Sequence, residues 1–381
     1  MTNSNYHSKS MKIGVLKETQ KGETRVSISP KIVKQLIEKK FEIIVEKNAG
    51  KSASFKNSEY IEAGAQIESR GVIFKEADVL IKINPFDSDD LKLVNKGQIL
   101  VSQLFHKSHP DLVQEISKTG ASAFSLDAIP RISRAQDMDV LSSQSNLAGY
   151  KAVIRGAYEM TKIFPLMMTA AGTITPARVL VYGVGVAGLQ AIATAKRLGA
   201  IVEATDIRPE TKEQTESLGA KFITVENETD DVSEGGYAKV ASEDYLNKQK
   251  EAVNKSLFQA DLVITTAMIP GRKSPVLITE NQVDHMKNGA VIIDLAAMEG
   301  GNCELSKMNK TIIHNGVKII GTTIAPESVS TNASDLFAKN MYNFLIHLTE
   351  GNQFKWDLEE EITDATLIVH KGKIRQNGKL N

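Results

Sequence analysis

Residues 178–206, RVLVYGVGVAGLQAIATAKRLGAIVEATD, decide the fold of this chain. They begin with an apolar run rich in Val and Leu, continue through a glycine turn at residues 183–188, and then carry apolar residues at helical spacing. A second apolar run ends in Asp206, about 20 residues after the turn. This order predicts a strand, a phosphate-binding turn, a helix and a second strand of a βαβ unit.

Each glycine of the turn has its own expected role. Gly183 makes the sharp turn, Gly185 lets the backbone approach a pyrophosphate, and Gly188 allows the helix to pack closely on the strand. The pyrophosphate is expected at the helix N-terminus. The alternative is a glycine turn in a βαβ unit that binds no nucleotide.

Asp206 favours NAD over NADP as the ligand of this turn. Its carboxylate can accept the ribose hydroxyls of an adenosine, and its charge would repel the 2′-phosphate of NADP. Arg208, two residues further on, could serve a phosphate and is the feature that favours NADP.

The composition excludes several classes of protein. The 381 residues hold 46 basic and 46 acidic side chains, so there is no basic excess for nucleic acid and no acidic excess typical of disorder. Cys303 is the single cysteine, which excludes a disulfide framework and a multi-cysteine metal site and favours a reducing compartment. No apolar run reaches membrane-spanning length, and the N-terminal residues lack the apolar core of a signal peptide. We expect a chain of about two domains in the cytoplasm, with no metal site.

Apolar strands alternate with helical segments along the whole chain. Such alternation predicts two doubly wound parallel sheets with helices on both faces. Strands are expected at 12–16, 41–46, 78–83, 98–104, 121–126, 178–182, 201–205, 221–225, 261–266, 290–295 and 316–320, and helices at 31–39, 57–63, 111–117, 189–198, 210–218, 242–258 and 279–286.

The remaining segments connect or extend these two sheets. A long helix over 142–164, stopped by Pro165, is expected to run from one domain to the other, and a helix over 333–348 to return to the first domain. We expect a loop at MMTAAGTITPA and another at residues 226–241, which are acidic and contain two adjacent glycines. Residues 366–374 are typical of a hairpin that turns at Lys371 and Gly372.

Residues 131–144, RISRAQDMDVLSSQ, are dense in polar side chains just before the long helix. A loop that joins two α/β domains is expected to line the ligand cleft at the carboxyl ends of the strands. The alternative is a solvated, charged linker.

The seven histidines form no metal-binding pattern such as HExxH. His106 and His109 follow a predicted strand end, where a dehydrogenase could place a proton-transfer residue. Surface or helix-capping histidines are the alternative.

Several long motifs in the order of this chain resemble a known family. RISRAQDMDVLSSQSNLAGY, FPLMMTAAGTITPARVLVYGVGVAGLQAIATAKRLGA, GGYAK, TTAMIPGRKSPVLIT and IIDLAAMEGGNCE resemble the NAD(H)-binding components, alpha subunit domain I, of proton-translocating NAD(P) transhydrogenases. The likeness runs from about residue 11 to the tail. The fold is shared with alanine dehydrogenase, whose N-terminal signature resembles KIGVLKETQKGETRVSISP, including Arg25, and whose lysine is matched at Lys82.

The resemblance implies a domain division and a set of nucleotide contacts. Residues 11–141 with 327–381 would form an alanine-dehydrogenase-like domain, and residues 142–326 an NAD(H)-binding Rossmann domain. The residues with an implied catalytic, orienting role at the nicotinamide end are Arg131, Gln136, Asp139 and Ser142. The further implied nucleotide contacts are Ile132, Ser133, Asp137, Met138, Val186, Ala187, Gly188, Asp206, Ile207, Arg208, Gly236, Tyr237, Gln249 and Met268, with Tyr237 in a loop that closes over the nucleotide.

One departure separates the chain from alanine dehydrogenase. By alignment, the catalytic acid of that enzyme falls at Met298 and its catalytic histidine at Phe105, one residue before His106. Amino-acid dehydrogenation needs an acid and a base near the reacting carbon, whereas hydride transfer between two nicotinamides moves no proton. The missing acid favours transhydrogenation. A stand-alone alanine-type dehydrogenase and a non-catalytic NAD-binding sensor are the alternatives.

The resemblance also implies partners. NAD(H) would bind this chain and NADP(H) a partner component, and a membrane-spanning component would carry the proton. This chain would be a homodimer, peripheral at the cytoplasmic face of the membrane, with no transmembrane segment of its own.

Overall fold

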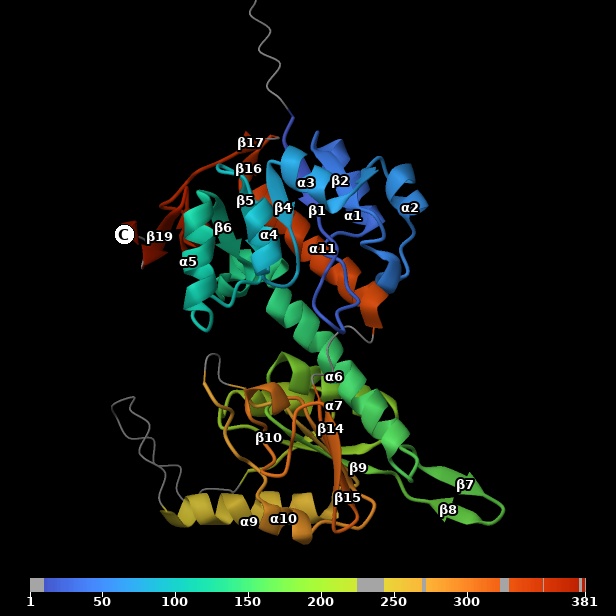
Figure 1. Cartoon of the computed structure of the whole chain (residues 1–381). Helices are drawn as coiled ribbons and strands as arrows, with labels where there is room; N and C mark the ends of the chain where they lie inside the picture. The colour runs from blue at the N-terminus through green and yellow to red at the C-terminus, as the bar shows by residue number, and fades with distance from the viewer. Residues whose placement is uncertain are drawn as a thin grey trace, which may run out of the picture. The chain divides into compact units, whose positions relative to one another are not determined.

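The computed structural model of the chain describes residues 10–224, 243–268, 272–322, 329–351, 353–376 and 379–380. The chain packs as two units (Figure 1): unit 1 is Met1–Gln144 with Pro326–Asn381, and unit 2 is Ser145–Ala325. Helix α6 (Val140–Glu159) begins in unit 1 and continues in unit 2. That residues 142–326 form a domain that folds independently stays a prediction.

Unit 1 is built on a nine-stranded sheet of order β20-β19-β18-β6-β5-β4-β1-β2-β3. The six strands from β6 to β3 are parallel, and the three strands from the C-terminal tail are antiparallel. The elements are β1 (Lys12–Val15), α1 (Pro30–Glu38), β2 (Glu42–Glu46), η1 (Lys51–Ala53), α2 (Asn57–Glu62), β3 (Gln66–Glu68), α3 (Arg70–Glu76), β4 (Val79–Ile81), α4 (Ser88–Leu93), β5 (Ile99–Ser102), α5 (Pro110–Thr119), β6 (Ser122–Ser125), η2 (Leu126–Ala128), η3 (Ser133–Met138), α11 (Ser330–His347), β16 (Thr349–Glu350), β17 (Gln353–Phe354), α12 (Glu361–Thr366), β18 (Leu367–His370), β19 (Lys373–Gln376) and β20 (Lys379–Leu380).

The strands of unit 1 are apolar on both faces because helices cover both. Alternate residues such as Val79 and Ile81 pack with α1 and α11 in one core, and Leu80 packs with α3, α4 and α5 in the other. Figure 1 shows α11, from the C-terminal part of the chain, lying among the N-terminal elements, as predicted for residues 333–348.

Unit 2 is built on a seven-stranded sheet of order β11-β10-β9-β12-β13-β15-β14, parallel except for β14. One face packs with α6 and α7, and the other with α9 and α10. The elements are β7 (Met167–Thr169), β8 (Gly172–Ile174), β9 (Arg178–Tyr182), α7 (Val186–Arg197), β10 (Ile201–Thr205), α8 (Thr211–Ser217), β11 (Lys221–Phe222), α9 (Glu243–Gln259), β12 (Leu262–Thr265), α10 (Glu280–Asp284), β13 (Val291–Asp294), η4 (Ala297–Glu299), β14 (Lys310–His314) and β15 (Val317–Gly321).

The predicted α/β fold with two mainly parallel sheets is confirmed, and three details of the prediction are wrong. The sheets are mixed, because β14 and the tail strands run antiparallel. The long helix ends at Glu159 and does not reach Phe164. The expected loop MMTAAGTITPA contains the hairpin β7–β8, whose strand residues are all exposed. The tail hairpin is confirmed, and it turns at Lys371 and Gly372, both with positive φ.

Candidate nucleotide-binding site

The glycine turn lies at the point where the strand order of unit 2 reverses. From β9 the chain adds β10 and then β11 on one side, and later returns to add β12 and β13 on the other side of β9. In open parallel sheets, ligands bind at the carboxyl ends of the strands at such a switch point. The turn at residues 183–185 follows the carboxyl end of β9 and leads into α7.

Two of the three glycines are required by the packing of the turn itself. Gly183 has a φ of +89°, where a side chain would be strained, and a Cβ there would lie 2.8 Å from Oγ1 of Thr266. A Cβ on Gly188 would lie 1.9 Å from the carbonyl oxygen of Gly183. Gly188 therefore allows α7 to approach the turn closely, as the sequence predicts.

Gly185 differs because nothing in the structure fills the space beside it. A Cβ there would meet no atom within 4 Å, and the φ of −83° suits any residue. The first helical hydrogen bond of α7 runs from the Leu189 N–H to the Gly185 carbonyl, at 2.8 Å. The N–H groups of the first turn consequently face open space and can donate to an anion.

Asp206 fixes the glycine turn to the end of β10. Its Oδ2 accepts the Val184 N–H at 2.6 Å, and the Arg208 guanidinium donates to both carboxylate oxygens at 2.8 and 2.9 Å. Burial would raise the pKa of Asp206, but Arg208 and these N–H donors hold its pKa below the ordinary value. Asp206 is thus a carboxylate acceptor beside the turn, with Arg208 as its partner in this structure.

A buried network beneath the turn was not predicted from the sequence. The Thr266 hydroxyl donates to the Gly183 carbonyl at 2.9 Å, and the fully buried Asn302 amide holds the Ala267 backbone through both its N–H and its carbonyl. Asp294, also fully buried, accepts the Asn302 N–H at 2.8 Å. These residues position the turn, and their neutral types and wide spacing leave no recognisable sequence pattern.

The other implied contacts of unit 2 have varied surroundings. Val186 and Met268 are exposed, and Ile207 is almost fully exposed. Ala187 is buried against α6, where Gly149 contacts its backbone. Gln249 donates from its amide to the Ile223 carbonyl at 3.0 Å, and its own buried Oε1 has no partner among the described residues. Gly236, Tyr237 and the predicted loop at 226–241 lie outside the described residues.

In unit 1, the segment from η3 to α6 is anchored by hydrogen bonds. Asp139 caps α6, since its carboxylate accepts the Ser142 N–H at 2.9 Å and the Ser142 hydroxyl at 2.5 Å. The amides of Asn340 and Asn343, on α11, both donate to the Asp137 carbonyl. Asp139 and Ser142 therefore bond each other and fix the start of α6.

Other side chains of this segment differ in how they are held. Arg131 and Gln136 are exposed, and neither makes a side-chain hydrogen bond or ion pair with any residue that the structure describes. Ser133 is exposed as well, whereas Met138 is buried in the core of unit 1 and Ile132 packs against that core. The loop therefore presents an amide and a guanidinium on an anchored backbone.

Arg25 and Lys82 are buried in unit 1, and each has a carboxylate partner. The Arg25 guanidinium contacts Glu23 at 2.6 Å and donates to Gln144 at 2.9 Å. The Lys82 amine contacts Asp90 at 2.8 Å. Both cations are thus neutralised by side chains of the chain itself.

The positions aligned with the catalytic groups of alanine dehydrogenase hold no acid. Met298 is 63% exposed, and Phe105 carries an exposed ring on a backbone with a φ of +47°. Burial lowers the pKa of His106, and its buried Nδ1 has no hydrogen-bond partner among the described residues. The described parts of the chain contain no group of three or more His, Cys, Asp or Glu side chains placed to hold a metal ion.

Comparison with known proteins defines the class. Residues 14–148 match the N-terminal domain of the alanine dehydrogenase/PNT family, and residues 152–377 match its C-terminal domain. The chain therefore belongs to the alanine dehydrogenase/PNT family.

Within this family the likeness to transhydrogenases is strong. Over 374 residues the chain is 51% identical to the first of the separate parts of NAD(P) transhydrogenase subunit alpha in Rhodospirillum rubrum, covering 96% of this chain and 97% of that one. The crystal structure of transhydrogenase from Sinorhizobium meliloti matches with a TM-score of 0.87 and 40% identity, over 96% of this chain and 100% of that one. An L-alanine dehydrogenase structure matches with a TM-score of 0.80 and 25% identity, over 96% and 97%. The chain is an NAD(P) transhydrogenase subunit of the alpha type, as predicted.

Proposed function

We propose that this subunit binds NADH and presents its nicotinamide to NADP+ held on a partner component, so that hydride passes directly between the two nucleotides. Membrane-spanning components would couple this transfer to proton translocation. The observation that carries the proposal is the glycine turn at the switch point of unit 2, where the space beside Gly185 is open at the N-terminus of α7.

The residues of unit 2 fit a dinucleotide. The N–H groups of the first turn of α7 can donate to a pyrophosphate, and Gly185 leaves room for it. Asp206 offers a charged acceptor for the adenosine ribose, which favours NAD because a 2′-phosphate would be repelled. The unpartnered Oε1 of Gln249 and the exposed Met268 are further proposed contacts, with Val186, Ala187, Ile207 and Arg208.

The side chains of residues 131–142 are proposed to orient the nicotinamide end. Bound NADH supplies the hydride, which leaves the dihydronicotinamide ring with its electron pair. Gln136 and Arg131 are the groups proposed to set the direction of that ring, because their side chains are exposed and without partners in the described structure. Asp139, Ser142 and Asp137 hold the backbone that carries them.

This reaction needs no acid or base at the reacting carbon, and the chain offers none at the aligned positions. Hydride transfer between two nicotinamide rings moves no proton, whereas oxidation of an amino acid does. A methionine at position 298 and a phenylalanine at position 105 therefore suit the proposed transfer.

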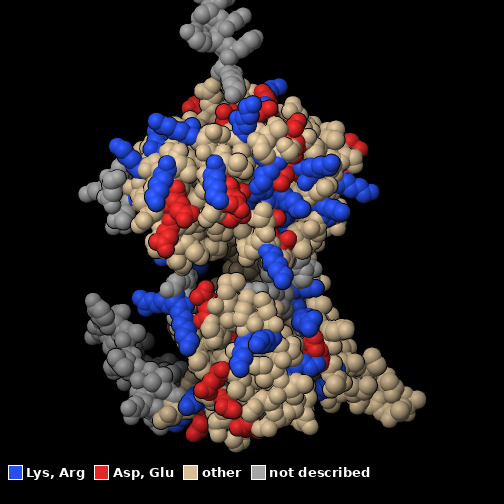
Figure 2. Space-filling model, viewed as in Figure 1, with Lys and Arg blue, Asp and Glu red and all other residues tan. Residues whose placement is uncertain are grey.

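We also propose that the subunit is a homodimer that uses the β7–β8 hairpin. Figure 1 shows the hairpin extending away from the sheet of unit 2, and in Figure 2 its surface is free of charged residues. Leu166, Met167, Met168 and Ile174 are exposed there, with Met168 at 78%. Exposed apolar side chains gathered on a projecting hairpin are typical of an interface.

Analytical ultracentrifugation tests this interface. The Met168→Glu variant should weaken the dimer by roughly tenfold or more, because a charge would be buried in an apolar contact. Ile313→Glu is the matched control, since Ile313 is a similarly exposed residue on β14 of the same unit. Equal dimer strength in both variants, or a monomeric wild type, would remove the hairpin from the proposal.

The proposed partners are an NADP-binding and a membrane-spanning transhydrogenase component, with this subunit peripheral at the cytoplasmic face. The Rhodospirillum rubrum relative is named as one part of a divided alpha subunit, which implies that other parts exist. No helix in the described residues combines the length and the apolar character that crossing a bilayer requires.

A mixing assay tests the function. The purified chain is combined with the NADP-binding component of a transhydrogenase, and reduction of an NAD analogue by NADPH is followed. We expect transfer with the pair and none with either component alone. NADH binding without transfer would favour the sensor alternative, and turnover of alanine or pyruvate by the chain alone would favour the dehydrogenase alternative.

A further inference from the structure

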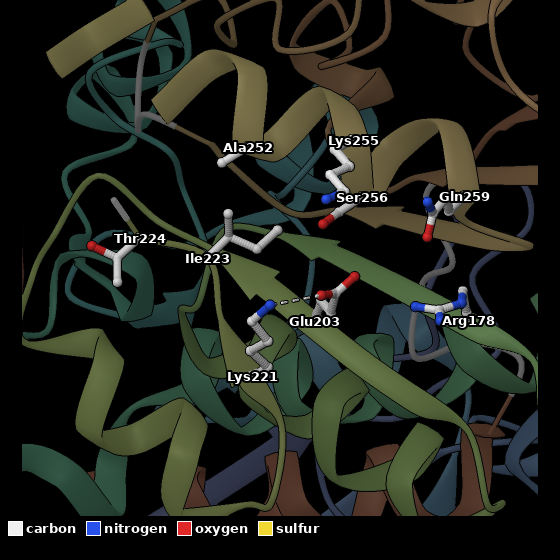
Figure 3. A pocket seen from close by; sticks show the side chains of 9 residues that line it. All are labelled: Arg178, Glu203, Lys221, Ile223, Thr224, Ala252, Lys255, Ser256 and Gln259. Atoms are coloured by element: carbon white, nitrogen blue, oxygen red, sulfur yellow. Dashed lines mark ion pairs between the residues drawn. The ribbon is translucent and has the colours of Figure 1, made fainter. Parts of the chain in front are cut away.

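Unit 2 contains a second cavity, separate from the glycine turn, between α9 and the edge of the sheet. It has a volume of about 350 Å³. Figure 3 shows its lining side chains, with those of the strands on one side and those of α9 on the other. The residues are Arg178, Glu203, Lys221, Ile223, Thr224, Ala252, Lys255, Ser256 and Gln259.

The cavity results from a change of character across one face of the sheet. Leu180 and Tyr182, two and four residues after Arg178 on β9, point to the face that packs with α9 in an apolar core. Arg178 shares that face at the amino end of the strand, and Glu203 and Lys221 are cross-strand neighbours on β10 and β11. The apolar contact with α9 therefore gives way to a charged corner.

Positive charge predominates in this corner. Arg178, Lys221 and Lys255 face a single carboxylate, Glu203, which lies 3.6 Å from the Lys221 amine. The side chains of Arg178 and Lys255 make no hydrogen bond or ion pair with any residue of the described ranges. Two cations are thus available for an external anion.

The neutral lining residues add suitable donors. Ser256 and Thr224 offer hydroxyl groups, and Gln259 offers an amide. A planar guanidinium, an ammonium and hydroxyl donors together form a donor set that suits a phosphate group, which accepts several charge-assisted hydrogen bonds. We infer that this cavity is a binding site for a phosphate group, either free orthophosphate or a small phosphomonoester.

This site is distinct from the proposed nucleotide site. Arg178 begins β9, whereas the glycine turn follows its last residue, Tyr182. A strand rises about 3.3 Å per residue, so the two ends of β9 are roughly 13 Å apart. Binding at this cavity is therefore expected to persist when NADH is present.

Line broadening of the orthophosphate signal in phosphorus NMR tests the inference, with the full chain and saturating NADH. We expect saturable broadening with the wild type. Lys255→Gln and Arg178→Gln should each weaken orthophosphate binding by about fivefold or more, because each loses a charge-assisted donor. Ribose 5-phosphate would displace orthophosphate if a monoester is the ligand, and would fail to do so if the site takes the free ion.

Two further variants separate a specific site from general charge effects. Lys250 is exposed on the same helix and does not line the cavity, so Lys250→Gln should change binding by less than about twofold. Glu203→Gln should tighten binding severalfold, because it removes the one repulsive charge. Broadening that does not saturate, or that falls equally in Lys250→Gln and Lys255→Gln, would show that these cations are only solvated.

Discussion

In unit 2 the proposed nucleotide contact is made by backbone, whereas in unit 1 it is made by side chains. The glycine turn has no side-chain donors of its own, and its shape is set by Gly183 and Gly188. Residues 131–142 instead present Arg131 and Gln136 from a backbone anchored to α6 and α11.

This difference separates two kinds of tolerance to change. A backbone site fails when a single methyl group cannot be accommodated, because protein interiors are closely packed. A side-chain site on an anchored backbone should lose its function in steps, while the fold is kept. The following substitutions test that contrast, beginning with the largest expected effect.

Gly188→Ala should destabilise unit 2 and abolish NADH binding. Its Cβ would lie 1.9 Å from the Gly183 carbonyl oxygen, so the turn or α7 must shift, at a cost of about 2 kcal/mol or more. Denaturant unfolding and NADH titration measure both effects. Gly185→Ala is the matched control: its Cβ meets no atom, so stability should change by less than about 1 kcal/mol while NADH binding is lost. Equal stability of the two variants would contradict the steric account.

Asp206→Asn should weaken NADH binding by about 1–3 kcal/mol and reduce the preference over NADPH, because a charged acceptor becomes neutral. The Asn oxygen can still accept the Val184 N–H, so the turn should be kept. Isothermal titration with both nucleotides measures the change. Unchanged affinity and selectivity would remove Asp206 from the site.

Gln136→Asn should slow hydride transfer while sparing NADH binding. Shortening the side chain by one methylene moves the amide, and misplacing reacting groups by about 1 Å can cost on the order of 100-fold in rate. We expect transfer in the reconstituted complex to fall by roughly tenfold or more, with NADH affinity within a few fold. If affinity is lost together with rate, Gln136 is a binding residue, and the orienting role passes to Arg131 or Asp139.

Glu360 provides the smallest test, through the anchoring of η3. It contacts Arg134 at 2.8 Å and His347 at 2.8 Å. Burial would raise the pKa of Glu360, but the Thr363 N–H and His347 hold it at about 2, below the ordinary 4.5. The charged form stabilises the folded state, so this contribution is complete above pH 4.5 and is lost as the pH falls toward 2.

Thermal unfolding of the wild type and Glu360→Gln across this pH range measures that contribution. The wild type should lose more stability between pH 6 and pH 3 than the variant, by an amount of the order of 1 kcal/mol. Parallel pH profiles would show that Glu360 stabilises no part of the fold through its charge.

The sequence predicts the structure best where local pattern and packing agree. The apolar strands of both sheets and the glycine turn have strong local signals, because both faces of each strand are covered and each glycine is sterically required. The β7–β8 hairpin was missed because its strand residues are all exposed and lack apolar alternation. β14 was missed because a partly exposed antiparallel edge strand differs from the buried strands beside it.

The candidate site divides in the same way. Gly183, Gly185, Gly188 and Asp206 follow from spacing alone, whereas the nicotinamide-end residues came only from the family resemblance. Thr266 and Asn302, which position the turn, lie far along the chain from it and carry no charge. Only the folded structure brings them beneath Gly183.

The most direct test of the account follows the hydrogen itself. NADH that carries deuterium at the hydride-donating position is mixed with the chain, the NADP-binding component and NADP+, and the NADPH formed is analysed by mass spectrometry. Direct transfer without a catalytic acid or base predicts that the deuterium is fully retained in NADPH, and that none enters from heavy water when unlabelled NADH is used. NADPH carrying hydrogen from the solvent would contradict the account.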